Sequence, residues 1–380
     1  MASPTGFKHF AKFFLFIVWS IVYVLADDLK LEQVNVVFRH GDRTPNNAKD
    51  ETYATDPYRQ DQFYPYGPAA LTNQGKRRSY ELGQVLRQRY DQFLGEIYYP
   101  HEVYGRSTDS DRTKMSLALV LAALYPPVED QRWNSTLNWQ PAVYTYMPFL
   151  KDGLLMPFIC PKYLNEYRRV EASEEILTKF SEYDELKENV SFLTGKNITN
   201  FLDLFILYHT FLTQSKMGLT LPSWVSTYFP GGQLKDAAVF QYKLFNYNTM
   251  LKRRNGGILL HRMIMDMRTS MATQTLAKKK INLYSGHDVT VFSLLNTLGI
   301  DSDDVPEFGS AAILELYSKD DNYFVKVVRY LGIPATIEEL TIPGCETLCP
   351  FEQFVVLTTP VIPIGIELAC DIVEDPPTGY

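Results

Sequence analysis

The chain has 380 residues, of which 46% are hydrophobic and 21% are charged, as in an ordinary globular protein. This length suffices for one large domain or for a domain that carries a sizeable insertion. The formal net charge of −7 argues against a nucleic-acid-binding protein, which would usually be basic.

Residues 1–26 have the pattern of a secretory signal peptide. Two lysines and no acidic residue precede an apolar run from Phe13 to Leu25, and the small residues up to Ala26 fit cleavage before Asp27. An uncleaved membrane anchor is the alternative, but the run is short for a span of roughly 20 residues. No later stretch is long and apolar enough to cross a membrane, so the sequence predicts a secreted protein, with a lysosomal lumen less favoured.

The segment VNVVFRHGDRTP, residues 34–45, is interpreted as a buried strand that ends in charged residues. A continuous valine run is typical of a central strand. Arg39, His40 and Arg43 follow where the apolar residues end. Crowded like charges would stabilise a fold little, so we expect a negatively charged ligand among them. Gly41 permits close backbone approach. Asp42 could orient an arginine or serve as a turn residue, and the turn role is favoured.

The next segments predict a helix and then a strand, a turn and a second helix. Apolar residues of the segment 71–90 fall largely on one helical face, with Thr72 as N-cap. A short strand near residue 103 ends close to Arg106. The second helix has its cap among residues 109–111 and stops before two prolines at 126 and 127. Asp109, Asp111 and Arg112 are interpreted as a structural charge network near the helix start.

Residues 131–230 differ in character from the rest, because tryptophan and proline recur among polar helical runs. We interpret them as an inserted, mostly helical cap between two parts of a core, residues 27–130 and 231–380. Three glycosylation acceptor sequences in this region, at Asn134, Asn189 and Asn197, indicate an exposed surface.

The remaining segments alternate between helix and strand. Residues 237–271 predict a helix broken at Gly256 and Gly257, followed by a strand at 281–284, a turn at 285–288 and a helix at about 289–298. Two late segments, AAILELYS and YFVKVVRYL, predict paired strands. This alternation predicts an α/β fold with a central mixed sheet.

Three predicted strands end in charged or titratable residues, and ligands of open α/β sheets bind outside the carboxyl ends of the strands. The residues are Arg39, His40, Arg43, Arg106, His287 and Asp288. Arginine presents a fork of donors that matches phosphate oxygens. A neutral imidazole is a competent nucleophile toward phosphorus, and surrounding positive charge keeps it neutral. A carboxylic acid can protonate a departing alkoxide.

The chain resembles histidine acid phosphatases of the prostatic, lysosomal and insect venom type over nearly all of its length. The resemblance rests on RHGDRTP, LTNQGKRRSYELGQVLRQRY, VYGRSTDSDRTKMSLA and YSGHDVTV. It implies a phosphoglycerate-mutase-like α/β core with a helical cap, no metal or other cofactor, and a phosphohistidine intermediate. His40 would be the nucleophile and Asp288 the proton donor. The phosphate ligands would be Arg39, Arg43, Arg106 and His287. A homodimer is also expected from the family.

The four cysteines predict two disulfides, as is usual for an even count in an oxidising compartment. Cys345 and Cys349 are four residues apart between prolines and suit a small bridged loop. That leaves Cys160 to pair with Cys370. Relatives of this type carry six cysteines, and their third pair, between cap and core, has no counterpart here.

The leading hypothesis is a secreted acid phosphomonoesterase that acts on small-molecule or phosphoprotein phosphate monoesters. A phytase-like polyphosphate phosphatase is less favoured, because residues 46–67 contain two basic residues against four acidic ones. A related mutase is disfavoured by secretion. A non-catalytic binding protein would be expected to lack His40 or Asp288. We expect an acidic pH optimum, where His40 is neutral and Asp288 is protonated.

Overall fold

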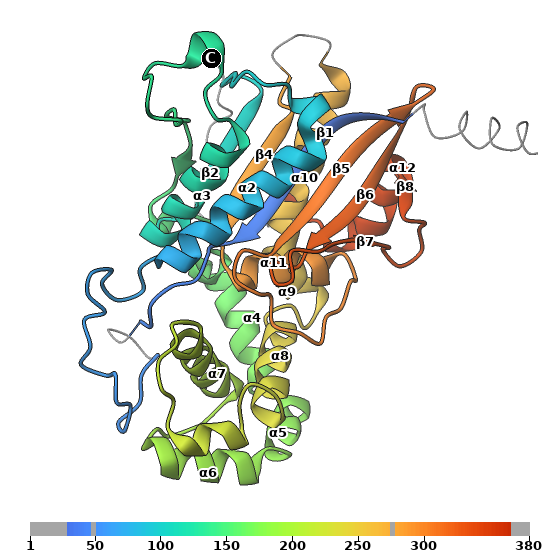
Figure 1. Ribbon diagram of the computed structural model, residues 1–380. Coiled ribbons are helices and arrows are strands. Elements are labelled where there is room, and N and C mark those ends of the chain that lie inside the picture. Colours follow the sequence, from blue (N-terminus) through green and yellow to red (C-terminus); the bar gives the residue numbers. More distant parts are fainter. Residues whose placement is uncertain (1–28, 47–50, 274–277, 366–380) are drawn as a thin grey trace, which may run out of the picture.

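The computed structural model describes residues 29–46, 51–273 and 278–365, and its centre is an eight-stranded sheet (Figure 1). The strand order is β3-β2-β4-β1-β5-β6-β7, and β8 pairs with β6. The strands are β1 (Lys30–Arg39), β2 (Val103–Ser107), β3 (Thr145–Tyr146), β4 (Ile281–Gly286), β5 (Ala311–Lys319), β6 (Asn322–Tyr330), β7 (Ile337–Leu340) and β8 (Leu348–Pro350). Strands β3, β2, β4 and β1 are parallel neighbours, whereas β5 runs antiparallel to both β1 and β6. The predicted α/β class with a central mixed sheet is confirmed.

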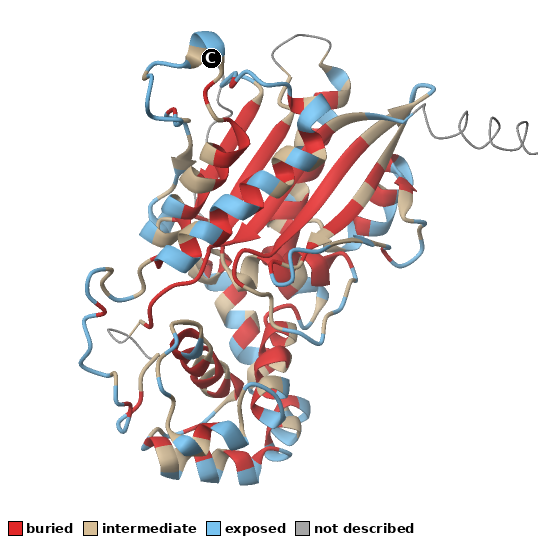
Figure 2. Ribbon diagram, viewed as in Figure 1, coloured by how far each residue is buried: buried red, intermediate tan, exposed pale blue. Residues whose placement is uncertain are grey.

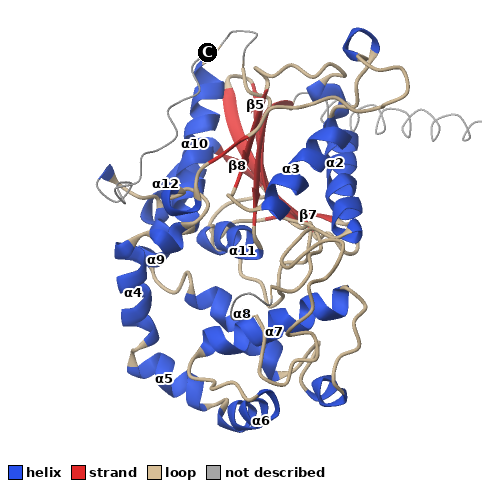
Figure 3. Cartoon of the chain, turned by 90° about the vertical axis from the view of Figure 1, so that its left-hand side faces the viewer, coloured by secondary structure: helices blue, strands red, loops and turns tan. Residues whose placement is uncertain are grey.

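Helices cover both faces of the sheet, as the view along its edge shows (Figure 3). On one face lie α2 (Asn73–Leu94) and α3 (Asp111–Leu124), and on the other lie α10 (Gly256–Ala272), α11 (Asp288–Thr297) and α12 (Phe351–Thr358). Side chains of β1 alternate between the two faces: Val36 packs with the α2 and α3 residues, and Val37 packs with those of α10 and α11. Because both faces are covered, the valine run of β1 is continuous.

A second group of helices lies beyond the carboxyl ends of the parallel strands (Figure 1). It comprises α4 (Pro161–Glu171), α5 (Glu174–Ser181), α6 (Asp184–Thr194), α7 (Phe201–Lys216) and α8 (Gln233–Leu244), which we call the cap. The cap has its own apolar cluster, and its helices turn buried faces inward and exposed faces outward (Figure 2). The remaining helices are α9 (Thr249–Arg254) and the short 3₁₀ turns η1 (Glu129–Gln131), η2 (Phe149–Lys151), η3 (Pro157–Ile159), η4 (Ser223–Thr227) and η5 (Thr359–Val361).

The predicted cap boundaries at residues 131 and 230 remain a proposal, and the packing favours later ones. Residues of β3 pair with β2 in the core sheet, so the chain is still part of the core at Tyr146. At the other end, Leu234 and Ala238 of α8 are buried in the apolar cluster of the cap.

The predicted helix break at Gly256 and Gly257 is confirmed to within one residue, because α9 ends at Arg254 and α10 begins at Gly256, with Asn255 between them. A further break follows α8, where the Asn248 side chain accepts a hydrogen bond from the backbone N–H of Leu251. Both glycines lie in the first turn of α10, where a Cβ atom on Gly257 would lie 2.2 Å from the carbonyl oxygen of Val361. They therefore permit close packing rather than interrupt the helix. The predicted Thr72 N-cap is confirmed, since its side chain accepts from the Gly75 N–H.

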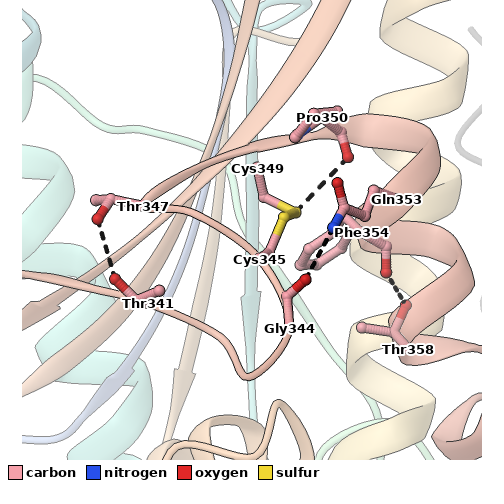
Figure 4. Close-up of a disulfide and its surroundings, with 9 residues drawn as sticks. All are labelled: Thr341, Gly344, Cys345, Thr347, Cys349, Pro350, Gln353, Phe354 and Thr358. Atoms are coloured by element: carbon pink, nitrogen blue, oxygen red, sulfur yellow. Dashed lines mark hydrogen bonds between the residues drawn. A yellow bond between two sulfur atoms is a disulfide. The ribbon is translucent and has the colours of Figure 1, made fainter.

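The predicted disulfide between Cys345 and Cys349 is confirmed (Figure 4). It closes a loop just before α12, where the Gln353 side chain also donates a hydrogen bond to the carbonyl oxygen of Gly344 at 2.8 Å. Cys370 lies outside the described residues, so its pairing with Cys160 stays a prediction.

Other predictions concern the surface and the chain start. Asn189 and Asn197 are exposed and Asn134 is partly exposed, and their glycosylation stays a prediction. The proposed signal peptide lies outside the described residues. Within the described part of the chain, none of the helices combines the length and apolarity needed to cross a membrane.

Candidate active site

The candidate site lies at the carboxyl ends of β1 and β4, between the sheet and the cap (Figure 1). Arg39 is the last residue of β1 and lies in register with Gly286 of the parallel neighbour β4. Since the two strands end together, His40 lies close to His287, and their ring centroids are 5.5 Å apart. The first and third predicted strands therefore converge, as expected from the sequence.

His40 is held in one tautomer. Its side chain is buried, and its Nδ1 lies 2.7 Å from the carbonyl oxygen of Gly41. A carbonyl only accepts hydrogen bonds, so Nδ1 carries the proton. Arg112 Nε donates a hydrogen bond to Nε2 at 3.1 Å, which requires a lone pair there. Burial and the positive charge of Arg112 place the pKa of His40 well below its usual value, so the ring is neutral.

Arg39 is buried and bound to the protein on several sides. Its Nη1 donates to the carbonyl oxygen of Pro306 at 2.5 Å, and its Nη2 forms an ion pair with Asp288 Oδ2 at 2.7 Å. The guanidinium lies 3.7 Å from the ring centroid of Phe308. Few rotamers satisfy these contacts, so the position of this charge is fixed.

Arg43 lies just beyond the turn that follows β1. It makes a bidentate ion pair with Glu51, at 2.8 Å from Nη1 and 2.7 Å from Nη2. Nη1 also donates to the carbonyl oxygen of Thr44 at 3.1 Å. Glu51 was not identified from the sequence, where it stood only among the acidic residues that follow the motif.

Arg106, expected from the sequence to bind phosphate, is buried and paired within the protein. Its Nη1 donates to the carbonyl oxygen of Ser107 and its Nη2 pairs with Asp152 Oδ1, both at 2.9 Å. Arg112, in the first turn of α3, is the arginine that contacts His40. The interpretation of Arg112 as part of a structural charge network is therefore wrong. Burial and the nearby Arg43 lower the pKa of Arg112 to about 10, and it remains charged in acid.

A signal for Arg112 was present in the sequence. Cations are disfavoured in the first turn of a helix because they face the positive end of the helix dipole. An arginine in the first turn therefore favours an anionic ligand nearby. Asp109, which was assigned to the same network, does form a local ion pair, at 2.6 Å with Lys114.

His287 and Asp288 lie where α11 begins. His287 Nε2 is 3.1 Å from the hydroxyl of Thr108, and burial and Arg112 lower the pKa of His287 to about 3. Asp288 Oδ1 accepts from the Val289 N–H at 2.7 Å. Burial acts to raise the pKa of Asp288, but Arg39 and two neighbouring histidines outweigh it, so the pKa lies below its usual range. The carboxyl is therefore ionised in the free protein in mild acid.

This arrangement suits chemistry on a phosphoryl group. It provides a neutral imidazole with an available lone pair, several fixed guanidinium groups and a carboxyl group on one side. Among the described residues, no group of three or more histidine, cysteine, aspartate or glutamate side chains is arranged to hold a metal ion.

Comparison with known proteins identifies the family. Residues 30–330 match the histidine phosphatase superfamily (branch 2). The chain is 44% identical to venom acid phosphatase Acph-1 of Apis mellifera over 355 residues, which cover 93% of this chain and 91% of that protein. The chain belongs to this superfamily as a histidine acid phosphatase.

Other relatives of this histidine acid phosphatase are mammalian. It is 34% identical to human prostatic acid phosphatase, with 94% of this chain and 92% of that protein covered, and 34% identical to human lysosomal acid phosphatase, with 91% and 81% covered. Among solved structures, a phytase of Klebsiella sp. ASR1 matches with a TM-score of 0.65 at 14% identity, covering 90% of this chain and 99% of that chain. At this identity the match shows the shared fold alone.

Asp42 of this histidine acid phosphatase is not merely a turn residue, so that interpretation is wrong. It is buried and forms a bidentate ion pair with Arg78 of α2, at 2.5 Å from Nε and 3.1 Å from Nη2. The pair fixes the turn that carries His40 against α2. Gly41 and Gly75 make this approach possible, because a Cβ atom on Gly41 would lie 2.1 Å from the carbonyl oxygen of Gly75.

Two residues of the cap also reach the site of this phosphatase. His209 of α7 and Tyr242 of α8 are buried, and His209 Nε2 lies 2.9 Å from the Tyr242 hydroxyl. The Tyr242 ring stacks on Phe292, four residues after Asp288 on the same face of α11, and burial and the Asp288 charge raise the pKa of Tyr242 well above its usual value. Burial lowers the pKa of His209 to about 4. A lone histidine in a helical cap gave no sequence signal for this contact.

Proposed function

We propose that this histidine acid phosphatase hydrolyses phosphate monoesters through a phosphohistidine intermediate, with His40 as the nucleophile. The contact between Arg112 Nε and His40 Nε2, at 3.1 Å, is the observation that carries the proposal. It places a positive charge beside the one ring nitrogen that has a free lone pair. A phosphoryl group that replaces this contact would meet the nucleophile and a stabilising charge together.

Arg39, Arg43, Arg112 and His287 are the proposed phosphate ligands, and Arg112 replaces Arg106 in the set expected from the sequence. The guanidinium groups stabilise the charge on the phosphoryl oxygens during transfer. When His40 Nε2 bonds to phosphorus, the ring becomes cationic. The Gly41 carbonyl oxygen, 2.7 Å from Nδ1, stabilises that charge by accepting the remaining N–H.

Asp288 is the proposed proton donor, but its carboxyl is ionised in the free enzyme, so we infer that the proton arrives with the substrate. A phosphate monoester keeps one proton below its second pKa of about 6. This proton passes to Asp288 and then to the leaving alkoxide as the P–O bond breaks. Water next attacks phosphorus and gives a proton to Asp288, and the P–N bond breaks to release His40. Asp288 then passes this proton to the departing phosphate and is ionised again. An acidic optimum stays the prediction, with the protonated ester as its physical source.

Secretion is proposed together with this activity. Curated relatives are named venom, prostatic and lysosomal acid phosphatases, which is consistent with the predicted signal peptide. A homodimer and a phosphoprotein substrate remain proposals that rest on the family resemblance alone.

The proposal is tested by the pH profile of p-nitrophenyl phosphate hydrolysis by the intact protein and by His40→Ala. We expect an acidic maximum that the substitution abolishes, while folding by circular dichroism is unchanged. An intact, folded protein that binds vanadate but hydrolyses no aryl phosphate between mildly acidic and neutral pH would instead be a binding protein.

A further inference from the structure

The proposed mechanism leaves some carboxylates of the site without a role. Among those that the structure describes, Glu51 accepts the most hydrogen bonds. Oε2 accepts hydrogen bonds from Arg43 Nη1 at 2.8 Å and from the Asn46 N–H at 3.2 Å, and Oε1 accepts from Arg43 Nη2 at 2.7 Å. The side chains of Arg43 and Glu51 are 7% and 22% exposed. Glu51 is thus a fixed negative charge at the rim of a phosphate site.

The contacts of Arg43 divide its five N–H donors into two sets. Glu51 and the Thr44 carbonyl oxygen take three of them, on the edge formed by Nη1 and Nη2. The Nε–H and the second Nη2–H remain, and within the described residues no hydrogen bond from Arg43 Nε is found. These two donors form a fork that suits two oxygens of one phosphoryl group.

The cap holds Glu51 in this position. Two residues further along the chain, the buried ring of Tyr53 packs in the apolar cluster of the cap, with ring centroids 5.9 Å from Phe211 and 6.3 Å from Trp224. Asp56 then accepts hydrogen bonds from Gln214 of α7, at 3.1 Å to each carboxylate oxygen. Glu51 is therefore anchored from both sides, by Arg43 on the core and by this segment on the cap.

We propose that Glu51 is a specificity-determining residue that selects esters with a single phosphate over substrates that carry a second phosphate beside the reacting one. This inference rests on the proposed function, because it assumes that Arg43 binds the reacting phosphate. Glu51 directs the Nε edge of Arg43 to one phosphoryl group and occupies the edge that a second one would use. Its charge also repels a neighbouring phosphate, and a pair of like charges about 7 Å apart at partial burial lowers binding by roughly tenfold or more.

The charge of Glu51 persists at the acidic pH where activity is expected. Burial acts to raise the pKa of Glu51, but the ion pair with Arg43 outweighs it, so the pKa lies below its usual value. Selection against a second phosphate should therefore hold across the mildly acidic range.

The test compares Glu51→Gln, which removes the charge, with Glu51→Asp, which keeps it. For each protein, kcat/KM is measured with p-nitrophenyl phosphate and with phytate, and the inhibition constants of phosphate and pyrophosphate are measured beside them. Glu338→Gln is the matched control, because Glu338 also pairs with an arginine, Arg329 Nη2 at 2.6 Å, but on β7 at the far edge of the sheet.

We expect Glu51→Gln to raise the ratio of kcat/KM for phytate to kcat/KM for p-nitrophenyl phosphate by about tenfold. The preference for pyrophosphate over phosphate as an inhibitor should rise by a similar factor. Glu51→Asp and Glu338→Gln should leave both ratios within about twofold of the unmodified protein. Unchanged ratios in Glu51→Gln, with parallel losses for both substrates, would overturn the inference and leave Glu51 as a support for Arg43. Failure of the unmodified protein to hydrolyse p-nitrophenyl phosphate would overturn the proposed function instead. The dissociation constants of phosphate and pyrophosphate, measured by calorimetry, would then still test Glu51 by binding alone.

Discussion

Arg106, which is buried, and Arg112, which is partly buried, are separated by one turn of chain, and their partners distinguish them. Arg106 pairs with Asp152, whose side chain is fully buried, so its charge is compensated inside the protein. Arg112 instead donates to the uncharged His40 ring. A partly buried cation that is hydrogen-bonded to a neutral base gains from an anion that joins it. The difference supports Arg112, and not Arg106, as the residue that binds the reacting phosphate.

We expect Arg112→Ala to lower kcat/KM for p-nitrophenyl phosphate by about 10²–10³-fold, the usual loss when one donor to a developing charge is removed. The substitution should also raise the pKa of His40, because Arg112 is, after burial, the main cause of its depression. The acid limb of the pH profile should then move to higher pH. A pH-rate profile checks both, and an unmoved acid limb would contradict the proposed contact.

Asp288 supports a prediction about the leaving group. In Asp288→Asn, the new side chain would occupy the same space but could not supply a proton. The decrease in kcat should therefore depend on how strongly basic the departing oxygen is. We expect kcat for glycerol phosphate to fall by about 10²–10⁴-fold, as when a general acid is removed. The loss with p-nitrophenyl phosphate, whose leaving group is weakly basic, should be much smaller. Equal losses for both substrates would contradict the role of proton donor.

At the scale of elements, the start of α2 determines where the nucleophile lies. The turn after β1 rests on α2 through the glycine contact and the ion pair between Asp42 and Arg78. Both partners in the glycine contact are backbone atoms, which cannot rotate away as a side chain can. The position of His40 therefore depends on an element that starts more than 30 residues later.

We expect Gly75→Ala to destabilise the fold more than the addition of one methyl group suggests, because the new Cβ atom would lie 2.1 Å from the carbonyl oxygen of Asp42. The cost of such overpacking is typically about 1–3 kcal/mol of unfolding free energy. Urea unfolding measures this cost, and kcat measures the displacement of His40. The control is Gly231→Ala, because the new Cβ atom would contact no other atom there and the φ of Gly231 is not in the left-handed region. Gly95→Ala is unsuitable because the φ of Gly95 is positive. Equal stability of the Gly75 and Gly231 variants would contradict the close contact.

The sequence predicted the strands and the motif residues because their signals are local. A continuous apolar run followed by Arg39 and His40 identifies a central strand and its functional end without knowledge of its neighbours. Arg112 and Glu51 depend on contacts between elements: α3 must reach back to β1, and residue 51 must be held by the cap. Asp42 was misread for the same reason, since its partner Arg78 lies in a different element. Composition and periodicity carry no record of such pairings.

At the scale of the whole molecule, the core and the cap build the site together. The core supplies the nucleophile and its arginines, whereas the cap supplies the hydrogen-bonded pair of His209 and Tyr242, on which the Asp288 charge acts, and anchors Glu51. The site therefore requires that the two parts keep their relative position. The interface concentrates buried histidines and charges, so we expect its stability to depend on pH.

Three histidines, of which His40 and His209 are buried and His287 is partly buried, determine the sign of this dependence. The pKa values of His40, His209 and His287 lie below the ordinary value in the folded state, with burial as the largest cause. At pH values between the folded-state pKa and the unfolded-state pKa of a histidine, the unfolded chain binds more protons than the folded chain. Their contribution to stability is therefore complete above pH of about 6.5 and is lost as pH falls toward about 4 for His209 and about 3 for His287. The depressed pKa of Asp288 adds a loss in the same direction at lower pH.

We expect the unfolding free energy to decrease from about pH 7 to about pH 4.5, with His209 alone contributing about 2 kcal/mol of the decrease. His209→Gln can still donate to Tyr242 but does not titrate, so its loss over this range should be smaller by that amount. Urea unfolding at both pH values measures the difference, with the exposed His101→Gln as control. Parallel losses in all three proteins would show that His209 titrates normally. A smaller decrease in unfolding free energy for His209→Gln would mean that the cap histidine destabilises this acid phosphatase in acid. This is the same pH range in which the substrate carries the proton that Asp288 needs.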